Sequence, residues 1–207
     1  VDNAGNVYAV DTYNHRIQKF DNQGNYLLKW GTQGNGNGEF NYPRRVAVDS
    51  DGYVYVADTN NYRIQKFDAT GAFVQAWGTK GNGSGQFDQP CGIAVDSNGN
   101  VYVADTYNHR IQEFNSDGVL VKVWGNYGPS DGQFHEPSVV AVDNAGKVYV
   151  ADTDRHQIQI FDSDGVFVKE WGNYGPSDGQ FHEPHDVAVD SAGNVYVADT
   201  DNTRIQK

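Results

Sequence analysis

The sequence predicts an all-β protein built as an array of four-stranded antiparallel sheets, and three observations carry that prediction. Relatives of the segment Gly99–Phe114, which reads Gly-Asn-Val-Tyr-Val-Ala-Asp-Thr-Tyr-Asn-His-Arg-Ile-Gln-Glu-Phe, occur five times. Anchored on a Val-Asp pair, the repeat units start at residues 1, 48, 95, 142 and 189, a constant step of 47 residues. The 207 residues include 24 Gly, 13 Tyr, 10 Phe and 4 Trp, a composition that argues against helical bundles and helical solenoids.

The second unit shows how each element follows from its residues. Short runs rich in β-branched and aromatic residues, typical of strands, alternate with turns of Asp, Asn, Ser, Thr and Gly, which tolerate positive φ or bond their own backbone. These runs predict strands at 45–48, 53–57, 63–67 and 72–77. Val74 and Ala76 alternate with larger residues, as in an outer, half-exposed strand. A Gly-rich crossing, Gly78–Gly85, leads to the next unit.

Four-stranded units of this length are typical of the blades of a β-propeller. One such sheet cannot bury both of its faces, so neighbouring units must stack. The chain holds four units of 47 residues and 19 further residues. We therefore expect about four and a half blades in a single continuous array over residues 1–207, with the first and last units incomplete.

The repeats resemble the NHL repeat family over essentially the whole chain. Its Asn-His pair, followed by Arg and Ile, stands at Asn14-His15 and Asn108-His109, while Asn-Tyr, Arg-His and Asn-Thr replace it in the other units. The resemblance implies a ring, commonly of six blades. Because this chain opens after a first strand and closes after a third, an open arc would expose strand edges and an apolar face. We expect part of a larger ring, or an arc whose ends another chain covers.

Charge and composition exclude several classes of function. The net charge of −12 opposes binding to nucleic acid or to anionic lipid, which need clustered Lys and Arg. No apolar run approaches 18 residues, so we expect no membrane span. The single Cys91 forms no intramolecular disulfide and is expected to be a small buried residue, and the lack of Met indicates a processed product or an excerpt. An extracellular or cell-surface location is expected.

Positions that differ between otherwise similar repeats indicate where a binding site could lie. One variable column follows the Pro that opens each first strand, and the other lies in the turn between the second and third strands. In an up-and-down blade both columns lie on one face, and binding residues are often found in loops on a rigid scaffold. The alternative explanation of this variation is neutral sequence drift at solvent-exposed positions. The predicted binding residues are Arg44, Arg45, Tyr62, Tyr107, His109, Ser138, Arg155, His185 and Asp186.

Three functions remain open on these residues. The first is a non-catalytic binding or scaffold module that recognises a protein, peptide or glycan and needs no cofactor. The second is a metal-dependent lyase or hydrolase holding zinc or calcium on His135, His182, His185 and Asp186, since NHL-type relatives include a zinc-dependent lyase with channel histidines and other six-bladed propellers are calcium-dependent. The equivalent positions of the earlier units do not supply such ligands. The third is an assembly protein that self-associates through unfinished ends.

Other recurring residues are expected to be structural. Turns such as Asp49-Ser50-Asp51-Gly52 resemble the opening of a calcium loop but lack its bidentate acid, so plain turns are favoured. The pair Asp58 and Arg63 brackets one turn and recurs in nearly every unit. We expect it to hold the hairpin or bond a neighbouring blade, as we do for the equivalents of Gln65 and for Trp30, Trp77, Trp124 and Trp171. Neither a nucleophilic triad nor a nucleotide-binding motif is present.

Overall fold

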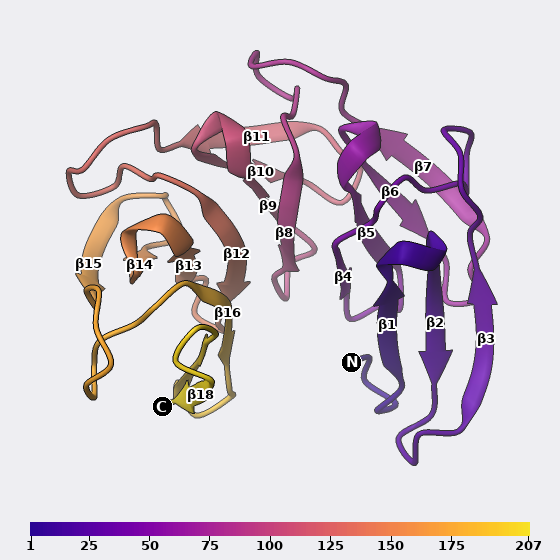
Figure 1. The fold of residues 1–207 in the computed structure, drawn as a ribbon. Coiled ribbons are helices and arrows are strands. Elements are labelled where there is room, and N and C mark those ends of the chain that lie inside the picture. Colours follow the sequence, from indigo (N-terminus) through magenta and orange to yellow (C-terminus); the bar gives the residue numbers. More distant parts are fainter.

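Each repeat folds into an antiparallel sheet, and a computed structural model describes all residues from Val1 to Lys207 (Figure 1). We number the sheets as blades 1 to 5. Blade 1 holds β1 (Val7–Asp11), β2 (Arg16–Phe20) and β3 (Tyr26–Trp30); blade 2 holds β4 (Arg45–Val48), β5 (Val54–Asp58), β6 (Arg63–Phe67) and β7 (Phe73–Trp77). Blade 3 holds β8 (Pro90–Val95), β9 (Val101–Asp105), β10 (Arg110–Phe114) and β11 (Leu120–Trp124); blade 4 holds β12 (Pro137–Val142), β13 (Val148–Asp152), β14 (Gln157–Phe161) and β15 (Phe167–Trp171). Blade 5 holds β16 (Pro184–Val189), β17 (Val195–Asp199) and β18 (Arg204–Gln206).

The all-β, blade-by-blade architecture is confirmed, but the expected count was wrong. Residues 1–207 form five blades of a β-propeller, where about four and a half were expected. The difference arises because both end units form complete three-stranded sheets: β1 to β3 pair without a preceding first strand, and β16 to β18 pair without a following fourth strand. No helix in the structure is long and apolar enough to cross a membrane.

The strands of each blade follow the chain from the middle of the molecule outward. The first strands β4, β8, β12 and β16 lie next to one another in that order, and the blades curve around them so that the two chain ends lie on the same open side (Figure 1). β8 and β12 approach closely because Gly92 has no side chain. A Cβ at that position would lie 2.7 Å from the Cα of Val139.

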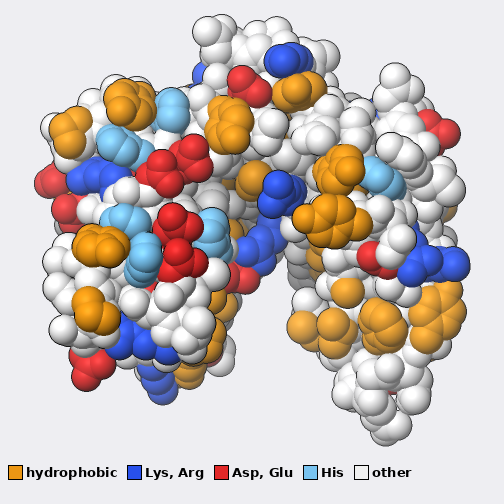
Figure 2. Space-filling view, viewed as in Figure 1, with side chains coloured by type: hydrophobic (Ala, Val, Ile, Leu, Met, Phe, Trp, Pro, Cys, Tyr) orange, Lys and Arg blue, Asp and Glu red, His pale blue; other side chains and the backbone are white.

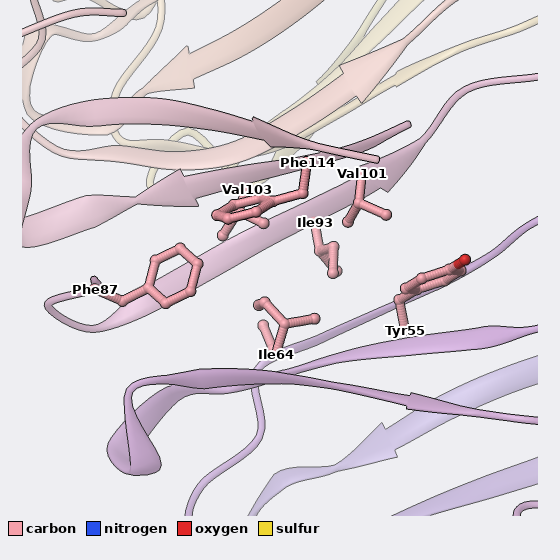
Figure 3. Close-up of a cluster of buried hydrophobic side chains, with 8 residues drawn as sticks. Tyr55, Ile64, Phe87, Ile93, Val101, Val103 and Phe114 are labelled. Carbon is pink, nitrogen blue, oxygen red and sulfur yellow. The ribbon is translucent and has the colours of Figure 1, made fainter. Parts of the chain in front are cut away.

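The core is divided into four clusters, one at each interface between blades. Between blades 2 and 3, the buried Tyr55, Ala57 and Ile64 face Val101 and Phe114, and Phe87 of the crossing closes one end (Figure 3). The same arrangement recurs at the other three interfaces. Burying a Phe or Ile side chain contributes about 1.5–3 kcal/mol, so each interface stabilises both of its blades.

The Trp that ends the outer strand of a blade reaches across to the next blade. The ring of Trp77 lies 5.9 Å from the ring of Phe114 and also covers Gly118, in the turn before β11. A Cβ on Gly118 would lie 2.7 Å from the indole Cδ2. Trp30 and Trp124 make the equivalent contacts at their interfaces, which agrees with the structural role expected for these residues.

The end blades each keep one face uncovered. All five residues of β5, β9 and β13 are buried, whereas Val7 of β1 is 41 % exposed and Ile205 of β18 is 67 % exposed. The apolar faces that pack together inside the array are therefore accessible at its two ends.

Candidate functional site

The turns between second and third strands share one local structure. Each internal turn is a short 3-10 helix (Thr12–Asn14, Thr59–Asn61, Thr106–Asn108, Thr153–Arg155) followed by one residue in the left-handed region. That residue is His15, Tyr62, His109 or His156, with φ between 52° and 56°. We call the face that carries these turns and the crossings between blades the recognition face.

Where the residue after the 3-10 turn is a histidine, its ring contacts the following crossing. His15 Nδ1 accepts a hydrogen bond from the backbone N–H of Tyr42 at 3.1 Å, and His156 Nδ1 accepts one from Glu183 at the same distance. His109 Nδ1 contacts the carbonyl oxygen of His135. These histidines thus hold the loops of the recognition face, which limits their availability to a ligand.

The predicted Asp–Arg pair also fastens loops to blades. In blade 3 the buried carboxylate of Asp105 accepts hydrogen bonds from the N–H of Asp88 at 2.7 Å and from Arg110 Nε at 2.7 Å. Arg110 in turn donates to the carbonyl oxygens of Gly83 and Gln86 in the crossing, both at 2.8 Å. Burial raises the pKa of the Asp105 carboxyl, while the hydrogen bonds oppose that rise. The loops of the recognition face are therefore held in place by hydrogen bonds to buried side chains of the blades.

The first variable column meets in the middle of the molecule. Arg45 Nη1 lies 2.7 Å from Asp186 Oδ2, and its Nη2 donates to the His185 carbonyl oxygen at 2.9 Å. This ion pair joins β4 to β16 across the centre of the array. Arg44 is exposed. Ser138 Oγ lies 2.6 Å from Thr153 Oγ1 within blade 4.

Cys91, in the same column, is half-buried, and burial raises the pKa of its thiol. Both observations favour the packing role that the sequence predicts, because the reactive form of a cysteine is the thiolate.

Residues of the second column differ in how freely they face solvent. Tyr107 is 51 % exposed. Tyr62 is half-buried beneath Lys80, whose Nζ lies 4.8 Å from the ring centre, and His109 packs against Tyr127. Arg155 donates to the carbonyl oxygens of three crossing residues, at 2.7 Å, 3.1 Å and 3.3 Å. Among these four predicted residues, Tyr107 is thus the most accessible anchor for a ligand.

Sequence reasoning missed three tyrosines on the same face. Tyr13 is 84 % exposed, and Tyr127 and Tyr174, from the crossings, are each 63 % exposed. A signal was present, because the positions equivalent to Tyr127 are Gln33, Lys80 and Tyr174, which makes a third variable column.

Histidines and carboxylates gather on the blades formed by β12 to β18, at the left of Figure 2. Donor atoms of His182, Glu183 and Asp201 all lie within 4.8 Å of one another. His182 Nε2 is 3.6 Å from Asp201 Oδ2, and His185 Nε2 is 3.7 Å from Glu183 Oε2. Three half-exposed or exposed groups of this kind could hold a metal ion.

The residues of this group only partly match the predicted metal ligands. His182 and His185 both lie beside Glu183, but Asp186 is paired with Arg45, and His135 stacks on Tyr127 with ring centres 4.8 Å apart. Sequence analysis did not include Glu183 or Asp201. Their signals were the Phe-His-Glu-Pro motif and the variable turn.

A cavity of about 850 Å³ lies at the C-terminal end of the array. It is lined by Trp171, Phe181, Val195, Val197 and Ile205 among others, and by none of the predicted binding residues. This cavity belongs to the uncovered side of blade 5, so it is not part of the recognition face.

Comparisons with known proteins place the chain by fold. A chain of a nidogen/laminin complex superposes with a TM-score of 0.76 at 17 % identity, over 98 % of this chain and 71 % of that one. Virginiamycin B lyase from Staphylococcus aureus, crystallised as a catalytically inactive variant with quinupristin, gives 0.74 at 16 % identity, over 99 % and 63 %. A streptogramin B lyase gives 0.72 at 16 % identity, over 98 % and 61 %.

At these identities the likeness concerns the fold alone, and the present chain spans less than two thirds of the length of either lyase. No curated protein sequence matches the chain significantly. The model of the NHL repeat, in contrast, matches residues 1–20, 40–67, 87–114, 134–161 and 181–207. Five matches over most of the sequence establish that the chain belongs to the NHL repeat family.

Proposed function

We propose that the protein is a non-catalytic recognition module that binds a protein, peptide or glycan on the recognition face. The observation that carries this proposal is the series of exposed aromatic rings at Tyr13, Tyr107, Tyr127 and Tyr174. Tyrosine is enriched among the few residues that supply most of the binding energy at interfaces. It presents a large contact area while losing little conformational freedom.

The support beneath these rings favours binding for a second reason. The crossing that carries Tyr127 is fastened to blade 4 by Arg155 and by Gln159, whose Nε2 donates to the Gln133 carbonyl oxygen at 2.7 Å. A loop that is already ordered loses less entropy when a ligand binds. Arg44, exposed beside the Arg45–Asp186 ion pair, adds a positive group near the middle of a chain with a net charge of −12.

An extracellular or cell-surface location suits this function and is part of the proposal. A chain of the nidogen/laminin complex shares the fold, so laminin is a reasonable first protein to test. Self-association is a further proposed contact, since Val7 and Ile205 expose apolar surface at opposite ends of the array. Sedimentation velocity at increasing concentration tests it: a constant monomer mass excludes it.

The experiment uses immobilised laminin and a glycan array as probes. We expect the wild type to bind at least one of them, and the double variant Tyr107→Ala/Tyr127→Ala to bind at least tenfold more weakly, because a lost anchor costs about 1–2 kcal/mol or more. Tyr26→Ala is the matched control, since Tyr26 is 54 % exposed at the opposite end of blade 1. Absence of binding to every probe, or equal losses in the control, would contradict the proposal.

A second candidate function, a metal-dependent lyase or hydrolase, is favoured by one observation, the grouping of His182, Glu183 and Asp201. A metal ion there could acidify a bound water molecule or polarise a substrate carbonyl. Turnover of a streptogramin by the metal-loaded protein would support this function. No turnover by a metal-loaded protein would leave the recognition function as the better account.

A further inference from the structure

We propose that His182, Glu183, His185 and Asp201 form a zinc site confined to blade 5. His182 and Glu183 are the last residues of the crossing before β16, and His185 lies in β16 itself. Asp201 comes from the turn between β17 and β18. The proposal is independent of the recognition function, because it concerns the binding of an ion and requires no macromolecular ligand.

The spacing of the donor atoms is close to that of a tetrahedral zinc site. Zinc binds nitrogen and oxygen ligands at about 2.0–2.2 Å, so two of its ligands lie about 3.3–3.5 Å apart. The pairs His182 Nε2–Asp201 Oδ2 and His185 Nε2–Glu183 Oε2 are separated by 3.6 Å and 3.7 Å. The donor atoms of His182, Glu183 and Asp201 already lie within 4.8 Å of one another, and the imidazole of His185, beside Glu183, would turn toward them to complete the set.

The backbone around the group is fixed by hydrogen bonds that leave the donor atoms free. The N–H of His182 donates to Asp199 Oδ1 at 2.7 Å, and the N–H of Asp201 donates to the His182 carbonyl oxygen at 3.1 Å. The N–H of Glu183 donates to His156 Nδ1. Crossing and turn are thereby held at a constant separation, which reduces the entropy lost on binding an ion.

The charges and donor types favour zinc over calcium. The two carboxylates give this group a local negative charge, and the only basic side chains close to Glu183 and Asp201 are histidines. Imidazole suits zinc and copper, whereas calcium takes six to eight oxygen ligands. The side chains of the four residues are between 34 % and 50 % exposed, so an ion could enter from solvent.

Blade 4 provides an internal comparison with the same residue types at the same spacing. His135, Glu136 and Asp154 are equivalent to His182, Glu183 and Asp201. In blade 4, however, the imidazole of His135 lies flat on Tyr127, at an interplanar angle of 15°. Their donor atoms do not come together as those of blade 5 do.

Two further differences separate the copies. The N–H of Glu136 donates to Asp152 Oδ1 at 3.0 Å, whereas that of Glu183 bonds a histidine, and Glu183 has a φ of 50°. The position of His185 is held by Ser138 in blade 4. The Phe-His-Glu-Pro motif is therefore insufficient for this site, which depends on the local conformation and on His185.

The test is titration of the full chain with zinc chloride by isothermal calorimetry. We expect one zinc ion per chain, and binding at least about tenfold weaker in His182→Ala and in Asp201→Asn, since even indirect partners of a metal site contribute that much. Asp201→Asn keeps the shape of an exposed side chain, so it separates lost ligation from misfolding. His135→Ala is the matched control and should bind as the wild type does.

A second readout is the absorption spectrum with Co²⁺, which we expect to show the visible bands of tetrahedral coordination, lost in Asp201→Asn. The proposal is wrong if the wild type binds no zinc, if His135→Ala loses as much affinity as His182→Ala, or if calcium binds more tightly than zinc. None of these outcomes bears on laminin or glycan binding, which is measured separately.

Discussion

Replacing Asp105 with Ala tests whether the buried aspartate network stabilises the array. The Asp105 side chain is fully buried and accepts hydrogen bonds from Asp88 N–H, Asn108 Nδ2, Arg110 Nε and Gln112 Nε2. Its loss leaves the guanidinium of Arg110, only 12 % exposed, without its anionic partner. Breaking a buried ion pair in this way costs about 3–5 kcal/mol. Arg110 keeps its bonds to crossing carbonyl oxygens, so we expect the lower end, about 3 kcal/mol.

Asp11→Ala is the matched control, because it removes the same residue from blade 1 in a more open setting. Asp11 and Arg16 are 23 % and 29 % exposed, and no backbone N–H of a crossing bonds this carboxylate. Such a pair contributes less than a buried one, because solvent screens the attraction. Urea unfolding followed by tryptophan fluorescence compares the free energies of unfolding. Equal losses of unfolding free energy in both variants would refute the idea that burial and the bonds to the crossing determine how much the Asp105–Arg110 pair stabilises the protein.

Three further predictions concern packing and acid stability. Gly118→Ala should lower the unfolding free energy by about 1–3 kcal/mol more than Gly99→Ala, because both glycines have positive φ but only the first lies against the Trp77 ring; equal melting temperatures would contradict this. Glu113→Gln should be stabilising at pH 7, since burial raises the pKa of Glu113 and its Oε2 has no hydrogen-bond partner. The gain in stability should shrink as the pH falls through that raised pKa, because protonation removes the buried charge of Glu113 from the wild type. A gain that does not change with pH would contradict this prediction. Hydrogen bonds from Thr70 lower the pKa of Asp68 below 3.8, so the stability they contribute is present above pH 3.8 and lost below it. Acid unfolding should be less steep in Asp68→Asn, and identical acid profiles would show that Asp68 contributes nothing.

Much of the fold could be predicted because it is local and repeated. The run 63–67 is β6 as predicted, and Val74 and Ala76 are the exposed residues of β7. Five copies of one pattern average out the uncertainty of any single segment. The role of Asp58 also followed from repetition, and the structure places it 2.7 Å from Arg63 Nε. The blade count differed because each end unit, which lacks one strand as the sequence predicts, still forms a sheet of its own.

The candidate site could be predicted only in outline, because it depends on how distant units meet. Arg45 and Asp186 are 141 positions apart, and no sequence pattern links them. Variation among copies did point to the face that holds Tyr107. This variation could not show that the curvature of the array brings Arg45 of β4 next to Asp186 of β16. Nor could it show that His135 and His182, which lie in identical motifs, have different surroundings.

The contacts of Trp30, Trp77 and Trp124 with a glycine of the following blade have a consequence for the history of the chain. Every repeat packs one face of its sheet on the preceding repeat and the opposite face on the following one. A duplicated repeat therefore fits against the repeat from which it was copied and needs no compensating substitution. The stretches 124–137 and 171–184 are identical in sequence, as recent copying would leave them. Genes of this kind can therefore lengthen or shorten by unequal recombination in steps of one 47-residue unit, with each product still able to stack.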